Sequence, residues 1–128
     1  IARRTREAIQ SGVPSKILNI AGKIEDITPH HILTALQQND VLAQKIWDET
    51  TEYLGRGLAV VINTFNPELI VLGGGVTAAG DLLFNPVRKK ALSYAFPRLA
   101  AVCSIVPAGL GSNVGVVGAA ACALESVQ

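Results

Sequence analysis

The residues best suited to chemistry in this chain are three consecutive glycines at the end of an apolar run. Gly73, Gly74 and Gly75 follow residues 69–72, which read LIVL, and precede Val76. A short apolar run after the turn signal Asn-Pro predicts a strand covered on both faces. Glycine lets the backbone turn sharply and leaves room for a ligand where a side chain would stand. A helix that starts at about Val76 would add unpaired N–H groups and a positive dipole end, so we expect a nucleotide here.

The same glycines also have a simpler interpretation, as a tight strand-to-helix turn that binds nothing. The dinucleotide-binding spacing Gly-x-Gly-x-x-Gly is not met, because residues 73–80 read GGGVTAAG. A second loop, around Gly111, follows the next predicted strand and would lie beside the first if the two strands pair. Ser112 or Asn113 in that loop is placed to cap the last helix.

Other polar and aromatic residues fit structural roles better than chemical ones. His30 and His31 are adjacent in the first turn of a predicted helix, without cysteines or acids at ligand spacing, and are interpreted as surface residues. Two short basic runs and one acidic set are interpreted as solvated helix faces: Arg3, Arg4 and Arg6; residues 88–90; and Asp40, Asp48, Glu49 and Glu52. Asp81 is expected to be a cap or surface group, and Trp47 to pack in a core or interface.

Composition predicts a folded domain, or a piece of one. The 128 residues are 49% hydrophobic and 16% charged, which excludes a disordered chain, and the net charge of +1 gives no argument for nucleic acid or membrane binding. Cys103 and Cys122 lie in apolar runs and are expected to be buried free thiols in a reducing compartment, the cytoplasm. Residues 69–80 and 114–124 are too short to cross a bilayer.

The expected elements are mostly helices. Helices are predicted at 2–11, from Thr28 to about Gln38, and from a cap at Asn39 and Asp40 to about residue 65, and residues 15–26 are expected to form a short helix or a loop. Beyond Leu54 the long helix is apolar nearly all round, so we expect its second half to be buried, with Gly55 and Gly57 permitting close approach of a neighbour.

Two strands are predicted, at 69–72 and 101–106. The intervening helix, from about Val76 with a restart at 85–86, predicts a right-handed parallel crossover between them. The last helix, 114–124, consists of small residues and could pack very close to a sheet or helix. Two strands make a thin sheet, and the mean hydropathy of +0.37 is high, so we expect that further strands belong to this domain.

Four segments together resemble the ROK family of repressors and sugar kinases. The segment NTFNPELIVLGGGV (63–76) is similar to the family's adenosine motif, and YLGRGLA (53–59) to its long helix. LGSNVGVVGAA (110–120) resembles its closing loop and helix, and ARRT (2–5) the helix after its zinc-binding cysteines. The resemblance covers nearly the whole chain, in order and at family-like spacing.

This resemblance implies an α/β fold, namely a segment of an actin-like ATPase (ribonuclease H-like) domain with a parallel βαβ unit and several packing helices. Residues 1–128 would be the carboxyl-terminal segment of the nucleotide-binding domain, with the amino-terminal domain and the first strands of this domain absent. The family's Asp-Gly-Gly-Thr phosphate loop, catalytic aspartate, sugar-binding Glu-x-Gly-His motif and structural zinc cysteines are not in the sequence. We therefore expect no catalytic residue and no metal ligand in this chain, which by itself would be inactive.

The resemblance further implies an ATP- and Mg-dependent hexose kinase of the glucokinase type. Gly73, Gly74, Gly75, Val76 and Gly111 would contact the adenosine side of ATP through their backbone. Many relatives carry an aspartate where Asn113 stands, so no role that needs a charge is assigned there. The implied partners are a sugar, ATP and a second copy in a homo-oligomer, without a membrane. The alternatives are a sugar-responsive ROK repressor, which alone would bind nucleic acid, and a non-catalytic sugar-binding relative.

Overall fold

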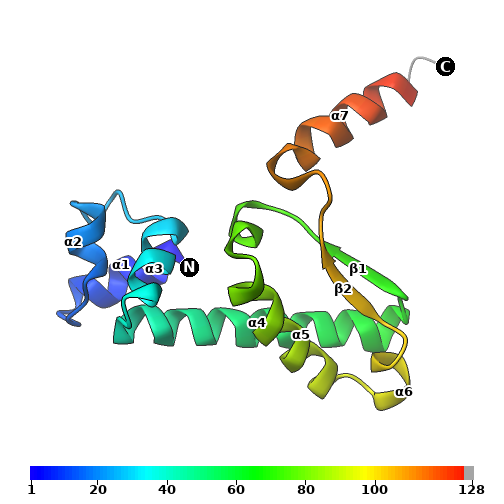
Figure 1. Cartoon of the computed structure of the whole chain (residues 1–128), viewed down its shortest axis with the longest axis horizontal. Coiled ribbons are helices and arrows are strands. Elements are labelled where there is room, and N and C mark those ends of the chain that lie inside the picture. Colours follow the sequence, from blue (N-terminus) through cyan, green and yellow to red (C-terminus); the bar gives the residue numbers. More distant parts are fainter. Residues whose placement is uncertain (126–128) are drawn as a thin grey trace. The chain divides into compact units, whose positions relative to one another are not determined.

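A computed structural model describes residues 1–125, without the side chains of residues 112, 114 and 125. Short helices precede one long helix and a two-stranded sheet (Figure 1). The chain divides within the long helix into two compact units, Ile1–Leu54 and Gly55–Gln128. The elements are α1 (Ala2–Gln10), α2 (Ile17–Ala21), α3 (Pro29–Gln37), α4 (Val41–Phe65), β1 (Leu69–Leu72), η1 (Gly75–Ala79), α5 (Asp81–Tyr94), α6 (Pro97–Ala100), β2 (Ser104–Pro107), η2 (Gly111–Asn113) and α7 (Val114–Glu125).

The first unit is a cluster of helices around an aliphatic core. The predicted helices at its start are confirmed as α1, α2 and α3, and α2 ends at Gly22 with a φ of 80° that glycine tolerates. Their apolar faces meet the first turns of α4 in a core made of Ile17, Ile27, Ile32, Ala35, Leu42, Ala43 and Ile46. Trp47 is also buried, as predicted.

Two polar residues in this unit, which could be mistaken for metal-binding or catalytic residues, cap the starts of helices. The backbone N–H of Thr28 donates to Nδ1 of His31 at 3.3 Å, so His31 completes a capping box at the start of α3. Asp40 caps α4, because its Oδ1 accepts a hydrogen bond from the N–H of Ala43 at 2.8 Å. Its Oδ2 accepts a second hydrogen bond from the N–H of Lys16, just before α2, at 2.7 Å. Asp40 is therefore buried, and its assignment to a solvated acidic face was wrong.

Each of the three arginines of α1 has a polar partner, and two of these partners lie outside the helix. Arg3 pairs with Glu7 at 2.7 Å on the exposed surface, and Arg4 pairs with Glu49. Arg6 donates to the carbonyl oxygen of Ile27 at 2.9 Å. Arg4 and Arg6 thus bind α1 to other parts of its unit, and only Arg3 fits the solvated interpretation.

The second unit contains the parallel strand pair that the sequence predicts. Leu69 is paired with Ser104, and Leu72 with Pro107. The first strand has the predicted bounds, but β2 begins at Ser104 and not at residue 101. Pro97 is the reason, since it starts the short helix α6 and the chain is still turning at residues 101 and 102.

Helix α5, which connects the two strands, differs from its prediction in where it starts and in its course through Pro86. The chain leaves β1 through the 3₁₀ turn η1, and α5 begins at Asp81 and not near Val76, because Gly80 adopts φ 55°, ψ −132° and interrupts the helix. The helix then continues through Pro86 without a restart. Proline so close to the amino end removes one helical hydrogen bond, and the buried Leu83, Phe84, Val87 and Ala91 hold the helix on its core.

The second half of α4 is buried on one face only, which corrects the expectation of burial all round. Leu58, Ala59 and Ile62 are buried, whereas Val60 is 64% and Phe65 75% exposed. Gly55 permits the close approach that the sequence predicts, since a Cβ there would stand 2.6 Å from Cβ of Lys90 in α5. Gly57 has open space around it in the described part of the chain, so the same prediction was wrong for that residue.

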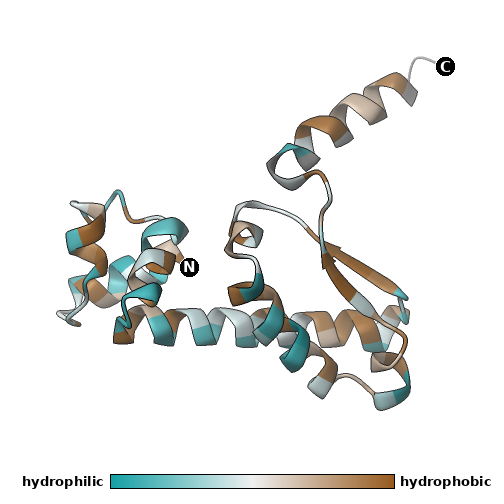
Figure 2. Cartoon of the chain, in the orientation of Figure 1, coloured by the Kyte–Doolittle hydropathy of each residue, from teal (hydrophilic) through white to brown (hydrophobic). Residues whose placement is uncertain are grey.

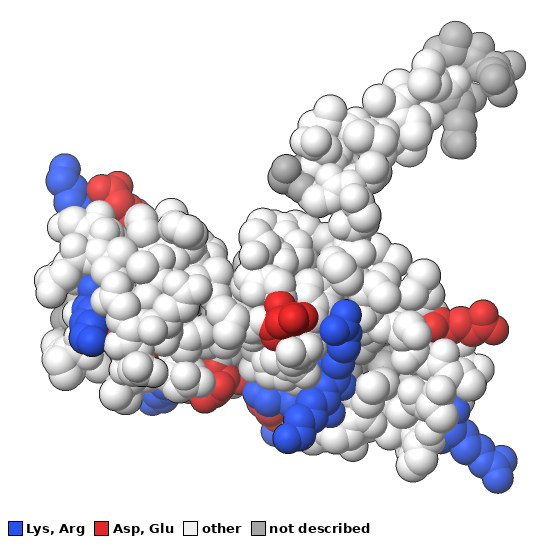
Figure 3. Space-filling model, viewed as in Figure 1, with Lys and Arg blue, Asp and Glu red and all other residues white. Residues whose placement is uncertain are grey.

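Helix α7 lies exposed along its described length. Its residues 115–124 are small and apolar (Figure 2), and on the face in view in Figure 3 this stretch is drawn white, as uncharged residues are. Residues 115–124 are all exposed, so the predicted close packing of α7 is not found among the described residues. Cys122 is accordingly exposed, contrary to the prediction of burial, whereas Cys103 is buried and burial raises the pKa of its thiol.

Candidate functional site

The two glycine loops emerge at the same edge of the sheet, because β1 and β2 are parallel and their carboxyl ends lie together. The N–H of Ala108, just after β2, donates to the carbonyl oxygen of Leu72 at the end of β1 at 2.8 Å. Beyond that bond the chain enters η1 on one side and η2 on the other, and these two turns are in contact. The structure thus brings together Gly73, Gly74, Gly75, Val76 and Gly111 at one edge, where α/β folds bind ligands.

The loop after β1 is exposed and held by its own backbone. Gly74 has φ 108° and ψ 168°, a conformation that only glycine adopts without strain. Its carbonyl oxygen accepts from both the hydroxyl of Thr77, at 2.6 Å, and the N–H of the same residue, at 3.1 Å. Gly73, Gly74 and Gly75 are exposed, while Val76 and Thr77 are half-buried. The outer surface of the turn is therefore backbone.

Gly75 does not need to be glycine for its conformation or its packing. Its φ lies outside the left-handed region, and a Cβ built on it would meet no described atom within 4 Å, whereas Gly74 is explained by its φ. Gly57 in α4 shares both properties of Gly75, so these properties alone do not indicate a ligand. What distinguishes Gly75 is its exposed position after the carboxyl end of β1, where a ligand can approach the backbone.

The second loop is a tight turn that leads into α7. Gly111 has φ 53°, and its N–H donates to the carbonyl oxygen of Ala108 at 3.2 Å. The N–H of Asn113 donates to Leu110 in the same way at 3.0 Å, and α7 starts at the next residue. The predicted helix start is thus confirmed, while capping by Ser112 concerns a side chain outside the described residues. Gly111 has a conformational reason to be glycine, with or without a ligand.

The edge offers backbone surface and few charges. Asp81 is exposed in the first turn of α5, which fits the predicted surface or cap role. Across the described residues no His, Cys, Asp or Glu side chains gather in a group of three that could hold a metal ion. Phosphoryl transfer needs a base and a metal or a cluster of cations around the reacting groups. The described edge therefore presents mainly backbone groups to a ligand.

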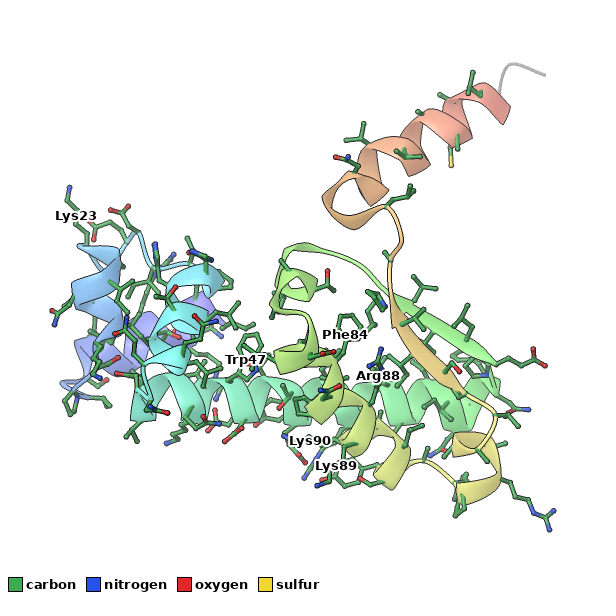
Figure 4. All side chains as sticks on the ribbon, viewed as in Figure 1. Lys23, Trp47, Phe84, Arg88, Lys89 and Lys90 are labelled. Atoms are coloured by element: carbon green, nitrogen blue, oxygen red, sulfur yellow. The ribbon has the colours of Figure 1, made fainter. Side chains whose placement is uncertain are left out.

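In the basic run on α5, Arg88 connects the helix to β2. The Nε–H of Arg88 donates to the carbonyl oxygen of Ile105 in β2 at 2.7 Å, and its guanidinium lies 5.1 Å from the ring centroid of Phe84. Figure 4 shows Arg88 on the side of α5 toward the strands, with Lys89 and Lys90 extending away from them. The solvated interpretation is thus wrong for Arg88, whose bond spans 17 residues and is not visible from sequence spacing.

A cavity of about 690 Å³ lies in the first unit. Apolar residues of α1, α4 and the connection after α1 line it, together with six charged residues: Arg4, Glu7, Lys16, Asp40, Lys45 and Glu49. Five of these have partners inside the unit: Arg4 with Glu49, Glu7 with Arg3, Lys16 with the carbonyl oxygen of Gln38 at 3.0 Å, and Asp40 with the N–H groups described above. Sequence analysis did not predict this cavity, because its lining comes from separate helices without a shared motif.

Known proteins similar to this chain give it a family context. The sequence model of the ROK family matches residues 3–126. A glucokinase of Thermotoga maritima is 33% identical over 99% of this chain and 40% of its own length. A ROK family glucokinase from Streptomyces griseus, solved in complex with glucose and AMPPNP, matches 94% of this chain and 40% of its own with a TM-score of 0.74 and 27% identity.

A transcriptional regulator is among the similar structures as well. A ROK family regulator described as a homolog of the E. coli MLC protein covers 83% of this chain and 26% of its own, with a TM-score of 0.67 and 30% identity. The chain thus spans about 40% of the length of the glucokinases it matches. The structural matches to ROK sugar kinases confirm the predicted fold class, a part of an actin-like ATPase fold with a parallel strand pair. No helix of the described residues combines the length and apolarity needed to span a membrane.

Proposed function

Because the chain belongs to the ROK family, we propose that it forms the adenosine-side wall of the ATP site in an ATP-dependent hexose kinase. Residues 1–128 would be the carboxyl-terminal segment of the nucleotide-binding domain. Gly73, Gly74, Gly75 and Val76 would pack their backbone against the adenosine and the nearest phosphate, with Gly111 on the adjoining loop. These residues bind and orient the nucleotide, and they move no proton.

Gly75 is the observation that carries this proposal. It lies exposed in the turn after β1, and this turn contacts the second glycine loop. A ligand at this edge of the sheet would touch its backbone, and even one methyl group there would displace it. The glucokinase neighbour solved with AMPPNP supports a nucleotide as this ligand.

The rest of the reaction would be carried by residues outside this chain. Transfer of the γ-phosphoryl group to a sugar hydroxyl needs Mg²⁺, a phosphate-binding loop and a general base, and the described residues contain no group of three His, Cys, Asp or Glu side chains that could hold the metal. When bound, Mg²⁺ would neutralise charge on the phosphates. Glucose or a related hexose is the proposed acceptor, on the strength of the glucokinase relatives. The chain alone is therefore expected to be inactive.

A ROK transcriptional regulator is the second candidate. The regulator structure is the observation that favours it, because it is more similar in sequence, at 30%, than the solved glucokinase, at 27%. A regulator does not need an ATP pocket, so nucleotide contact at Gly75 separates the two candidates.

Titration of the isotopically labelled chain with AMPPNP, followed by amide NMR, tests the proposal. One wall of a cleft predicts weak affinity, with a Kd of about 1 mM or higher, which corresponds to a binding free energy no more negative than about −4 kcal/mol. Amide shifts should change at residues 73–76 and 111. Adenosine should reproduce most of these changes and tripolyphosphate should not, since the proposed contact is with the adenosine side.

Two variants control the experiment. Gly75→Val should abolish the changes in amide shift, whereas Gly57→Val should leave them intact. The two variants are matched, because both glycines are exposed, lack positive φ and have open space around them. Shift changes that persist in Gly75→Val, or that fall away from both glycine loops, would contradict a nucleotide wall at this edge.

A further inference from the structure

We propose that Thr77 is a positioning residue for the nucleotide, because its hydroxyl fixes the orientation of the peptide unit between Gly74 and Gly75. This inference rests on the proposed function, which assigns the nucleotide to the backbone of residues 73–76. It adds a side chain that lies outside the glycine triplet and has no role in the proposed site so far. Thr77 acts through the loop and is not assigned a contact with the nucleotide.

Three consecutive glycines form a loop whose peptide units rotate easily. The peptide unit between Gly74 and Gly75 joins two residues without a Cβ, so a half-turn of this unit meets little steric resistance. Such a flip would exchange the places of the carbonyl oxygen of Gly74 and the N–H of Gly75, which point in opposite directions across a trans peptide. The loop therefore needs a contact that selects one of the two orientations.

Thr77 selects the orientation in which the carbonyl oxygen of Gly74 faces the inside of the turn. Its hydroxyl donates to that oxygen at 2.6 Å, and its backbone N–H donates to the same oxygen at 3.1 Å. A carbonyl oxygen has two lone pairs, so both are engaged. The N–H of Gly75, which is an exposed residue, consequently points away from Thr77.

The carbonyl side of Thr77 is anchored to the start of α5. Its carbonyl oxygen accepts from the N–H of Gly80 at 3.0 Å, and the carbonyl oxygen of Gly80 accepts from the N–H of Leu83 at 2.9 Å. Leu83 is buried in the first turn of α5. Thr77, which is itself half-buried, thus connects the glycine loop to a packed helix.

The orientation matters for a nucleotide because the two groups on this peptide unit have opposite polarity. A phosphate oxygen is attracted to an N–H and repelled by a carbonyl oxygen. With the bonds of Thr77 in place, a ligand that approaches Gly75 meets its N–H, and after a flip it would meet the carbonyl oxygen of Gly74. Thr77 therefore raises the fraction of molecules whose loop is competent to bind, and the apparent Kd is the intrinsic Kd divided by that fraction.

Amide NMR of the labelled chain with three substitutions tests the inference. Thr77→Val removes the hydroxyl at nearly constant volume, and Thr77→Ser retains it. Thr64→Val is the matched control, since Thr64 is exposed on α4 in the same unit. Without nucleotide, Thr77→Val should give a second set of amide signals, or exchange broadening, at Gly74 and Gly75, because the flipped orientation becomes populated.

Addition of AMPPNP provides a readout that a merely structural role would not move. The amide of Gly111 reports binding from the adjoining loop, which does not flip. The initial slope of its shift change against AMPPNP concentration should fall at least about twofold in Thr77→Val, by the same factor as the fraction of unflipped loops. Thr77→Ser and Thr64→Val should keep the slope and the spectrum of the unsubstituted chain.

Unchanged signals at Gly74 and Gly75 in Thr77→Val would overturn the inference, since the hydroxyl would then not hold the loop. An altered loop with an unchanged slope, or an equal loss in Thr77→Ser, would overturn it as well. Absence of AMPPNP-dependent shifts in the unsubstituted chain would contradict the proposed function itself, and the inference with it. The spectra without nucleotide distinguish this last case, because Thr77→Val would still alter the loop.

Discussion

Asp40 shows how a single residue holds the first unit together. Its carboxylate accepts hydrogen bonds from the N–H of Ala43, the N–H of Lys16 and the hydroxyl of Ser15. It thus caps α4 and at the same time fixes the chain that leads into α2. The residue is 5% exposed, so loss of its carboxylate would leave buried donors without partners.

We predict that Asp40→Ala lowers the free energy of unfolding by about 2–3 kcal/mol, which exceeds the usual helix-cap effect of about 1 kcal/mol. Urea denaturation measured by circular dichroism is the appropriate assay. The control is Asp26→Ala, since Asp26 is exposed in a turn of the same unit, and its effect should stay within about 0.5 kcal/mol. Equal effects of the two substitutions would show that the hydrogen bonds of Asp40 do not stabilise the first unit.

At the scale of elements, the approach of α5 to α4 depends on one glycine. A Cβ at Gly55 would stand 2.6 Å from Cβ of Lys90 and 3.2 Å from the backbone N of Ala91. The obstacle is backbone and the base of a side chain, which cannot move without α5. Gly57, two residues further on the same helix, has open space around it among the described atoms.

The two glycines therefore predict effects of opposite sign. Gly55→Ala should destabilise the second unit by about 1–3 kcal/mol through overpacking, although alanine is the better helix former. Gly57→Ala should stabilise the protein by up to about 1 kcal/mol, because it gains helix propensity without a clash. Thermal unfolding of both variants measures the difference, and stabilisation by both would refute the close packing of α4 and α5.

The sequence was sufficient for elements whose signals are local. Thr28, Pro29 and Asp40 mark their helix starts by local capping chemistry, and the run Leu69–Leu72 identifies β1 with the right bounds. Sequence patterns were not sufficient for two other boundaries. Pro86 lies within α5 because the buried face of that helix holds it in place, which depends on distant contacts. Strand β2 starts later than predicted because the short helix α6 occupies residues before it.

The same distinction applies to the candidate site. The glycine triplet could be identified from sequence, but its 3₁₀ turn, the conformation of Gly74 and the contact between η1 and η2 could not. Arg88 was assigned to a solvated face, because its bond to β2 depends on the tertiary fold. Neither sequence nor the described structure yet tests the assigned nucleotide contacts, which stay predictions.

At the scale of the whole molecule, this chain has more apolar surface than a self-sufficient domain needs. The edge of β1, one face of α4 and the described length of α7 are all uncovered within their unit. The chain spans about 40% of the length of the glucokinases that it matches. Formation of a homo-oligomer also stays a prediction, and the same exposed surfaces favour self-association when the remainder is absent.

ATP-dependent glucose phosphorylation by a complex of this chain with the part of Thermotoga maritima glucokinase that it does not match tests the central claim most directly. Neither polypeptide alone should phosphorylate glucose, and the complex should do so with Mg-ATP, since only the complex closes the nucleotide site. Gly75→Val should reduce this activity by at least about a hundredfold without dissociating the complex, and Gly57→Val should not. A stable complex that is inactive, or one that Gly75→Val leaves fully active, would contradict the assignment of this chain as the adenosine-side wall of a hexose kinase.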